Sequence, residues 1–291
     1  MFGVIVNPVS GVGKNVKLAD EFVKLLDQRG ESCRVFETAC AEDGVQQVRL
    51  AFESGCPASV CIGGDGTLSE IVPEMANSGK TLYVVPNGTG NDFVRCLNLP
   101  KDPMEAFKAQ LDGKAEKIDC GSLNGRAFIN VSGSGFDVEV LRKTEELKAV
   151  YPGSQAYTKA VLAVLGSYRA FEADVSIDGG AFEKKQCTII EVSNGKFFGG
   201  GMRVAPNAKI DDGMFDVVTV DRVPRQIIPF ILPLFKLGIH VYLQIAHVVK
   251  AKEIVLRAKG LVVNVDGNLH EMDEARYAIM PGALDMMLPK E

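Results

Sequence analysis

Short apolar runs alternate with stretches of helical spacing through the first part of the chain. The run at 4–6 predicts a buried strand, and apolar residues at 19, 22, 23 and 26 then recur on one helix face. The same alternation predicts strands at 33–36, 59–62 and 82–85, with helices between them. Such alternation is typical of an α/β domain with a mostly parallel sheet, which binds ligands beyond the carboxyl ends of its strands.

The pattern changes after about residue 118. Strand-like segments separated by glycine-rich turns follow at 127–131, 175–177, 188–192, 215–220 and 261–265. Two apolar segments, near 154–168 and 226–249, predict helical insertions. We therefore predict an α/β domain over residues 1–118 and a β-rich domain after it.

Composition narrows the class of protein. The 291 residues are 46% hydrophobic and carry a net charge of −5, which excludes a disordered or collagen-like chain and argues against nucleic-acid binding. The seven cysteines include no C-x-x-C pair, so neither a disulfide framework nor a zinc site is indicated. The N-terminus lacks the pattern of a secretory signal, and prolines interrupt the most apolar stretch, so we expect a cytoplasmic protein without a transmembrane segment.

Two glycine-rich loops follow predicted strands. Gly63-Gly64-Asp65-Gly66-Thr67 precedes a helix, where glycines let backbone N–H groups approach phosphate and the helix N-terminus attracts anions. An ordinary tight turn with Thr67 as helix cap explains one such loop equally well. The second loop, residues 86–92, follows the next strand, and two loops at one sheet edge indicate a site. Neither a Walker A nor a dinucleotide fingerprint fits the chain.

These loops belong to a series of motifs that resembles the diacylglycerol kinase catalytic-domain family, and in particular soluble bacterial lipid kinases similar to sphingosine and ceramide kinases. The motifs lie in the family's order along nearly the whole chain, at 6–11, 63–67, 86–93, 130–137, 194–201, 206–213 and 265–267. The resemblance implies an N-terminal nucleotide-binding domain, a C-terminal β-sandwich over residues 119–279 that takes the lipid substrate, and a return of residues 280–291 to the first domain.

The resemblance also implies the ligands. It assigns ATP binding to these positions: Asn7, Thr38, Gly63, Gly64, Asp65, Gly66, Thr67, Leu68, Ser69, Asn87, Gly88, Thr89, Asn91 and Asp92. It assigns a structural Mg²⁺ to Asp212 with the backbone carbonyls of Lys209 and Met214, which suits an ion that prefers oxygen ligands. An ordinary hairpin turn is the alternative reading of this segment.

The chain departs from the family at the expected base. Family members carry an acidic residue directly after the late Asp-Gly, whereas this chain has Asn268, whose amide cannot accept a proton at neutral pH. Asp65, Asp266, His270 and Glu271 are the candidate substitutes, and strand alternation predicts Asp266, Asn268 and His270 on one face. The alternative is a weakly active or non-catalytic nucleotide-binding relative.

The charge is unevenly distributed. Residues 222–260 contain seven basic residues and one acidic residue, a net +6, so the rest of the chain carries −11. Together with the apolar residues of 227–235, this composition fits either a surface resting on anionic lipid or a core helix with a solvated basic rim. We predict an ATP- and Mg²⁺-dependent kinase for the hydroxyl of a diacylglycerol-like lipid, in peripheral contact with a membrane. A sphingoid base or a polar small molecule is the rival acceptor, and the oligomeric state, a homodimer included, stays open.

Overall fold

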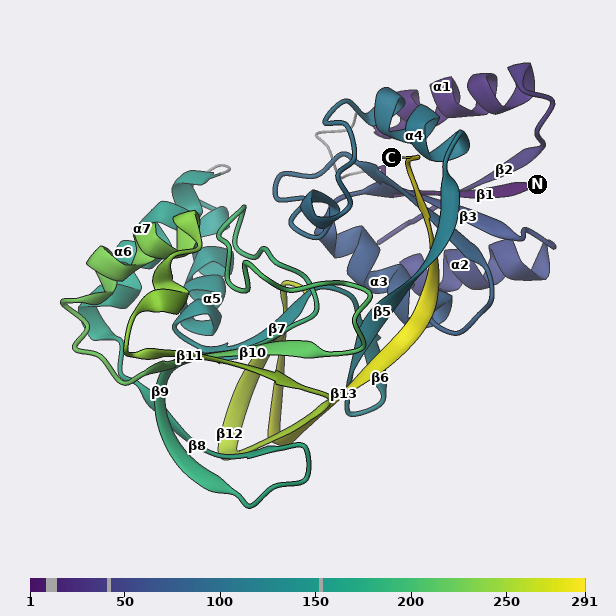
Figure 1. Cartoon of the computed structure of the whole chain (residues 1–291). Coiled ribbons are helices and arrows are strands. Elements are labelled where there is room, and N and C mark those ends of the chain that lie inside the picture. The colour runs from purple at the N-terminus through teal and green to yellow at the C-terminus, as the bar shows by residue number, and fades with distance from the viewer. Residues whose placement is uncertain (9–14, 41–42, 152–153, 291) are drawn as a thin grey trace.

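The computed structural model describes residues 1–8, 15–40, 43–151 and 154–290 (Figure 1). Its first half alternates strands and helices, as the apolar pattern predicts. The elements are β1 (Phe2–Val6), α1 (Asn15–Gln28), β2 (Cys33–Glu37), α2 (Gly44–Glu53), β3 (Ala58–Gly63), α3 (Asp65–Met75), β4 (Thr81–Pro86), the 3-10 turn η2 (Val94–Cys96) and α4 (Pro103–Leu111).

Strands β2, β1, β3 and β4 pair side by side in parallel, with α1 and α4 on one face and α2 and α3 on the other (Figure 1). Successive strand residues face opposite sides, so Val4 packs toward α1 while Ile5 packs toward α2 and α3. Helix α4 begins where Asp102 accepts hydrogen bonds from the N–H groups of Met104 and Glu105, and Pro103 occupies its first turn. The carboxyl ends of the parallel strands therefore meet at one edge.

The second half is built mainly from antiparallel strands. Its elements are β5 (Lys114–Leu123), β6 (Arg126–Phe128), β7 (Val131–Gly135), α5 (Phe136–Lys148), α6 (Ser154–Ser167), β8 (Phe171–Ile177), β9 (Glu183–Ser193), β10 (Phe215–Asp221), α7 (Ile228–Leu237), the 3-10 turn η3 (His240–Tyr242), β11 (Ala246–Ala251), β12 (Glu253–Val265) and β13 (Asn268–Leu288). In the hydrophobic core of this half, Phe128 of β6 stacks on Phe215 of β10, with ring centroids 5.9 Å apart.

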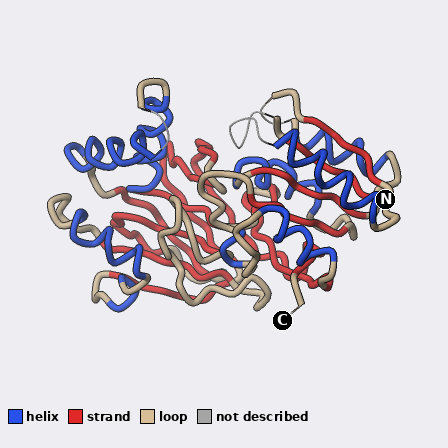
Figure 2. Tube along the Cα trace, turned by 90° about the horizontal axis from the view of Figure 1, so that it is seen from above, coloured by secondary structure: helices blue, strands red, loops and turns tan. Residues whose placement is uncertain are grey.

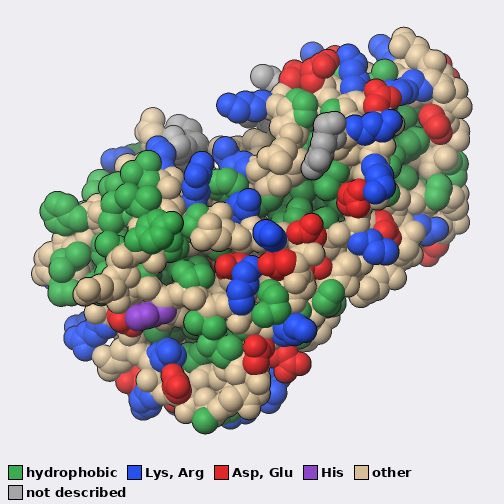
Figure 3. Space-filling view, viewed as in Figure 1, with side chains coloured by type: hydrophobic (Ala, Val, Ile, Leu, Met, Phe, Trp, Pro, Cys, Tyr) green, Lys and Arg blue, Asp and Glu red, His purple; other side chains and the backbone are tan. Residues whose placement is uncertain are grey.

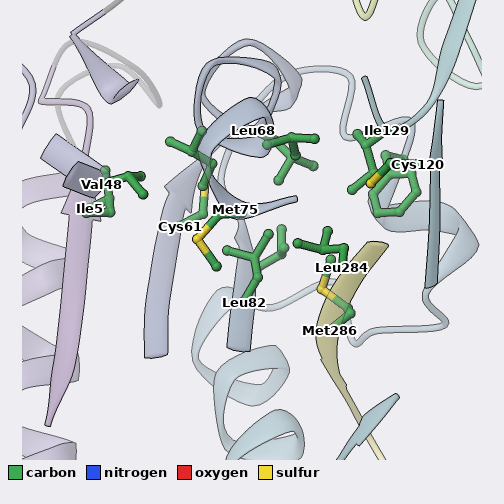
Figure 4. Packing of buried hydrophobic residues seen from close by; sticks show 14 of the residues in the cluster. Ile5, Val48, Cys61, Leu68, Met75, Leu82, Cys120, Ile129, Leu284 and Met286 are labelled. Atoms are coloured by element: carbon green, nitrogen blue, oxygen red, sulfur yellow. The ribbon is translucent and has the colours of Figure 1, made fainter. Parts of the chain in front are cut away.

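Strand β13 joins the two halves. It pairs with β12 along its first part and with β5 along most of its length, and Asp285 and Met286 pair in parallel with β4. Within the described residues the strands consequently form one continuous 13-stranded sheet, which Figure 2 shows running through both halves. Leu284 and Met286 pack in the same core cluster as Leu82 and Leu68 (Figure 4). This shared core fixes one half of the molecule against the other.

Several sequence-based expectations need correction. The parallel pairing predicted for the first domain holds for β1 to β4, but the sheet as a whole is mixed, because most of the later strands pair antiparallel. The predicted helical insertion at 226–249 ends at Leu237, where Gly238 adopts a left-handed conformation with φ 75°, and residues 246–251 form strand β11 instead. The domain boundary at residue 118 stays a prediction, since β5 runs through it. Among the described residues, no helix is long and apolar enough to cross a membrane.

Candidate active site

The two glycine-rich loops lie in direct contact at the carboxyl ends of β3 and β4. A Cβ on Gly88 would lie 2.4 Å from the Cα of Gly64, so only glycine allows this approach. The N–H of Asn87 donates to the carbonyl of Gly63 at 3.0 Å. The start of α3 faces the second loop, and its free N–H groups form the kind of cradle that binds phosphate.

The other predicted nucleotide residues lie near the same edge. Asn7 follows β1, and Thr38 follows β2 with its N–H bonded to the carbonyl of Val6 at 2.9 Å. Thr67 is buried against Gly63, and Leu68 belongs to the hydrophobic core, so these two side chains support the loop from behind. Thr89 is exposed at the tip of the second loop. Residues 9–11 of the first motif lie outside the described residues.

Asn15 is a site residue that the sequence analysis missed. Its side chain is fully buried and donates to the carbonyl of Asn7 at 2.9 Å, while its Oδ1 accepts a hydrogen bond from the Asn87 amide. A second donation reaches the carbonyl of Ile62 at 3.4 Å. The Asn15 amide thus links the carboxyl ends of β1, β3 and β4 through hydrogen bonds. The only signal in the sequence was a polar residue at the start of an apolar-faced helix.

Asp65 holds the second loop and lines the cleft. Its carboxylate accepts a hydrogen bond from the N–H of Phe93 at 3.4 Å, and the N–H groups of Asn91 and Asp92 also point to it. Burial raises the pKa of Asp65, and these N–H groups oppose the rise. These N–H groups hold the carboxylate in a fixed direction, as a proton-accepting base requires.

Asp92 lies beside Asp65 across Gly90. Its Oδ2 accepts a hydrogen bond from the N–H of Gly200 at 2.8 Å, and its Oδ1 lies 3.6 Å from Nε of Arg95. Burial raises the pKa of Asp92 to about 6; the Gly200 N–H lowers it and the neighbouring Asp65 charge raises it further. The neighbours of this buried carboxylate offset only part of the cost of its charge. Such a group is more typical of a functional site than of a residue that stabilises the fold.

We expect the Asp92→Asn variant to be more stable than the wild type above pH 6. A raised native pKa means that the native state binds more protons than the unfolded chain between about pH 4 and 6, so wild-type stability falls through that range. Asparagine does not titrate in this range, so the variant does not show this decrease in the free energy of unfolding, which amounts to about 1–3 kcal/mol. Urea unfolding at about pH 4 and about pH 8 measures the difference. An equal difference at both values contradicts the buried-charge explanation, and the exposed Asp20→Asn variant is the control.

Asp266 is a positioning residue. Its carboxylate accepts hydrogen bonds from the N–H groups of Ile129, Asn130 and Val131 at 2.8, 3.0 and 3.1 Å. Burial raises its pKa to about 6 against the effect of these donors. With φ of 48° and 92°, Asp266 and Gly267 form the two-residue turn between β12 and β13. The predicted strand alternation through Asp266, Asn268 and His270 is therefore wrong at its first member.

Asn268 bridges the two halves at the entrance of the site. Its amide donates to Oγ of Ser69 on α3 at 3.1 Å, and Ser69 in turn donates to the carbonyl of Gly66. The side chain is neutral and is linked to the glycine-rich loop through Ser69. An asparagine at this position thus contributes a donor where the resemblance implies a carboxylate.

A cavity of about 220 Å³ lies between the loops and the second half, and Asp65, Asp92 and Asp266 line it. A narrower apolar cavity of about 40 Å³ continues between α5, α6 and α7. The two cavities have lining residues in common, namely Asp137, Val140, Tyr157, Phe198 and Met202. The cleft, whose carboxylates stand in an otherwise mostly apolar lining, therefore adjoins an apolar extension.

A buried pair of acidic residues marks the junction of these cavities. Asp137 lines both of them and accepts a hydrogen bond from the Asn264 amide at 3.2 Å. Glu191 is completely buried behind it, and burial beside the Asp137 charge raises the pKa of Glu191 well above its usual range. Burial raises the pKa of Asp137 as well, so both carboxyl groups of this pair hold a proton more readily than exposed carboxyl groups do.

A lysine ammonium already contacts the turn that is predicted to bind Mg²⁺. Asp212 accepts hydrogen bonds from the N–H of Met214 at 3.1 Å and from Nζ of Lys250 at 2.6 Å. A divalent ion at this carboxylate would meet the Lys250 ammonium, so the turn as it lies does not fit Mg²⁺. Among the described residues, no group of three or more His, Cys, Asp or Glu side chains is arranged to hold a metal ion.

The basic window at 222–260 is divided in the structure. Lys250 pairs with Asp212 and Asp216, and Arg257 pairs with Glu274 of β13. Strand pairing brings these acidic partners from distant parts of the chain, which the sequence could not reveal. Helix α7 buries Ile228, Ile231 and Phe235 yet exposes other large apolar residues, so neither sequence-based reading of the window describes it completely.

A phosphate cradle beside a buried carboxylate, facing an apolar cavity, is typical of an enzyme that transfers a phosphoryl group to an acceptor with an apolar body. Comparisons with known proteins agree with this class. Residues 1–123 match the model of the diacylglycerol kinase catalytic domain, and residues 130–288 match the YegS C-terminal NAD kinase beta sandwich-like domain.

Curated relatives match along the whole chain. A diacylglycerol kinase of Mycobacterium tuberculosis is 30% identical over 98% of this chain and 94% of its own length. One of Staphylococcus epidermidis is 30% identical over 99% and 92%. The chain belongs to the diacylglycerol kinase family and is a lipid kinase. The two-domain architecture with a C-terminal β-sandwich-like domain follows from both family models.

Solved structures share the fold. A crystal structure of a diacylglycerol kinase from Bacillus anthracis superposes with a TM-score of 0.74 at 22% identity, covering 99% of this chain and 96% of that one. An NAD kinase from Archaeoglobus fulgidus, solved in complex with ATP, superposes with a TM-score of 0.56 at 12% identity, covering 100% and 94%. At these identities the likeness concerns the fold alone.

Proposed function

We propose that the protein transfers the γ-phosphoryl group of ATP, bound with Mg²⁺, to the hydroxyl of a diacylglycerol-like lipid. The observation that carries this proposal is the apolar extension that opens from the cleft past Asp137. A polar small molecule needs a closed polar pocket, whereas an acyl chain needs an apolar space continuous with the reacting centre. At about 40 Å³ the extension must widen as a chain enters.

The residues of the cleft supply the parts that phosphoryl transfer needs. A Cβ at Gly66, in the first turn of α3, would meet no atom within 4 Å, so this turn leaves room for a phosphate oxygen, and the start of α3 adds N–H donors. Asp65 is the best-placed group to accept the proton of the acceptor hydroxyl, because it lines the cleft and its direction is fixed. Phosphoryl transfer depends mainly on positioning and charge neutralisation, so the neutral Asn268 is compatible with activity.

The direct test incubates the purified protein with ATP, Mg²⁺ and separate acceptors: diacylglycerol, a sphingoid base, a ceramide and glycerol. Mass spectrometry then identifies the phosphorylated products. We expect phosphorylated diacylglycerol as the main product. Equal phosphorylation of glycerol would contradict the lipid assignment. Intact ATP binding without any product would favour the rival reading, a non-catalytic nucleotide sensor, which the amide at Asn268 supports.

We further propose that an exposed apolar ridge contacts the membrane. The ridge consists of Ile227, Phe230, Leu237, Ile239 and Tyr242 on α7 and the turn after it, and the exposed fractions of Phe230 and Tyr242 are 77% and 81%. Figure 3 shows hydrophobic side chains gathered over α6 and α7. Ile227, Phe230 and Leu237 recur at spacings of three and seven, which puts them on one face of the helix. Exposed apolar surface of this kind marks an interaction site.

Replacing Phe230 and Leu237 with serine should weaken vesicle binding by at least about 100-fold, because the two side chains together contribute about 3–6 kcal/mol when fully buried. Sedimentation with phospholipid vesicles measures the loss. The control variant replaces Val35 and Leu50, exposed apolar residues of the first half, with serine. Unchanged sedimentation, or a dimer in light scattering that the double variant abolishes, would contradict the membrane proposal.

Binding of Mg²⁺ by Lys209, Asp212 and Met214 stays a prediction, and it requires the Lys250 ammonium to leave Asp212. The Lys250→Met variant removes the competing charge. We therefore expect Mg²⁺ to raise the Tm of this variant by more than that of the wild type, as ligand binding to the native state does. Calorimetry with and without Mg²⁺ provides the measurement, and Lys252→Met is the control. Equal shifts in all three proteins would refute the site.

A further inference from the structure

A second cavity of about 220 Å³ lies outside the cleft, and basic side chains line it. Arg95 of η2 and Lys196 and Arg203 of the segment between β9 and β10 lie around it, and no acidic residue does. The cavity has no lining residue in common with the cleft or with the apolar extension. We call it the basic pocket. The basic pocket is thus distinct from the cleft, although Arg95 connects it to the second glycine-rich loop.

The positive charges of the basic pocket are poorly neutralised. In the described part of the chain, neither the Lys196 ammonium nor the Arg203 guanidinium makes an ion pair; Arg203 lies over the ring of Phe197 at 5.9 Å. Arg95 reaches the carbonyl of Gly90 at 3.0 Å and is 3.6 Å from Asp92. Three cations around one cavity repel each other, and an anion between them removes that repulsion. Guanidinium and ammonium donors match the oxygens of a phosphate group.

The basic pocket adjoins the apolar ridge. The N–H of Arg203 donates to the carbonyl of Phe235 in the last turn of α7 at 2.8 Å. A Cβ on Gly238 would lie 3.2 Å from Cδ of Arg203 and 3.2 Å from Pro206, so the pocket wall packs directly against the end of the helix. Leu237 and Ile239, on either side of Gly238, are exposed members of the ridge. Apolar side chains and a cationic cavity are thus side by side, as at a lipid–water interface.

We propose that the basic pocket binds the phosphate of an anionic phospholipid headgroup while the ridge enters the acyl layer. The pocket recognises phosphate oxygens, which a lipid headgroup and free phosphate both present; the adjoining ridge favours the lipid. This inference rests on the proposed membrane contact of the ridge. It adds a lipid-binding site that is separate from the acceptor site, so the protein would hold a phospholipid without phosphorylating it.

The test compares two charge-removing double variants. Lys196→Gln with Arg203→Gln neutralises the basic pocket, and Lys252→Gln with Lys259→Gln removes the same charge from exposed positions beside β11 and on β12. Arg95 is left in place because it contacts Asp92. Each protein is sedimented with phosphatidylcholine vesicles that contain or lack phosphatidylglycerol.

We expect the pocket variant to bind the phosphatidylglycerol vesicles about 10- to 30-fold more weakly than the wild type, because each basic residue near an anionic membrane contributes about 1 kcal/mol. Binding to pure phosphatidylcholine should change much less. The control variant should lose less than the pocket variant, and exchanging the two basic residues, Lys196→Arg with Arg203→Lys, should restore most of the binding. An equal loss in both charge-removing variants would overturn the pocket, because it would show attraction by net charge alone.

Inorganic phosphate distinguishes the two sources of the ligand. Calorimetric titration at constant ionic strength should show phosphate binding to the wild type that the pocket variant loses. If the variant loses phosphate binding but sediments with phosphatidylglycerol vesicles like the wild type, the lipid assignment is overturned. Phosphorylation of a short-chain diacylglycerol in detergent is measured on the same proteins. Activity there reports the proposed function, so failure of the pocket and failure of the kinase assignment are separate results.

Discussion

Replacing Asp65 with asparagine should lower kcat/KM for phosphoryl transfer by about 100- to 10,000-fold, the usual contribution of a general base. The asparagine side chain has the same shape and retains one oxygen to accept the hydrogen bond from Phe93, so the second loop should keep its place. It cannot take a proton from the acceptor hydroxyl. Steady-state kinetics with diacylglycerol measures the loss, and kcat should fall much more than KM rises.

Two further measurements make this result specific. Nucleotide binding by calorimetry should change by less than the activity does, because the loop geometry is preserved. The Asp20→Asn variant, at an exposed position on α1, should retain full activity. If Asp65→Asn keeps wild-type kcat, another group accepts the proton, and Asp92 on the opposite side of Gly90 is the next candidate.

Replacing Asp266 with alanine should lower the free energy of unfolding by about 3–5 kcal/mol. Three N–H groups, those of Ile129, Asn130 and Val131, lose their acceptor, and an unsatisfied buried donor costs about 1–3 kcal/mol. Alanine is also strained at the φ of 48° that Asp266 adopts. Chemical denaturation measures the change.

The Asp266→Asn variant separates the structural role from a catalytic one. Asparagine retains one acceptor oxygen and suits a two-residue turn before glycine, so we expect it to lose much less stability than alanine. If Asp266 only positions the backbone of 129–131, the asparagine variant also keeps most of its kinase activity. A folded asparagine variant with kcat as low as that of Asp65→Asn would instead place Asp266 among the catalytic residues.

The sequence predicted that the two glycine-rich loops meet at one sheet edge, because the signals for this arrangement are local. A buried strand, a glycine-rich loop and a helical face follow one another within twenty or so residues, as at 59–75, and parallel pairing then brings neighbouring loops together. The contact between Gly64 and Gly88 is a direct consequence of that arrangement. Short-range sequence patterns were therefore sufficient to predict how these two loops are arranged.

The interactions that the sequence did not reveal join distant segments. Asn15 bonds to Asn87, Lys250 to Asp212 and Asp216, and Glu191 packs behind Asp137. Each pairing depends on which strands become neighbours, and a polar residue alone does not show its partner. The same limit applies to Asp266: the motif marked it as a catalytic candidate but did not show that its carboxylate accepts hydrogen bonds from the distant backbone N–H groups of residues 129–131.

The late position of β13 in the sequence also affects how the first half folds during synthesis. Strand β4 ends the parallel set, and its open edge is paired only by Asp285 and Met286, close to the last described residue. During synthesis on the ribosome, the first half therefore waits with an exposed strand edge and an incomplete core until residues 284–286 have emerged. Exposed edges invite pairing with other chains. We expect nascent chains stalled before residue 285 to need chaperones and to acquire protease resistance only when β13 is complete.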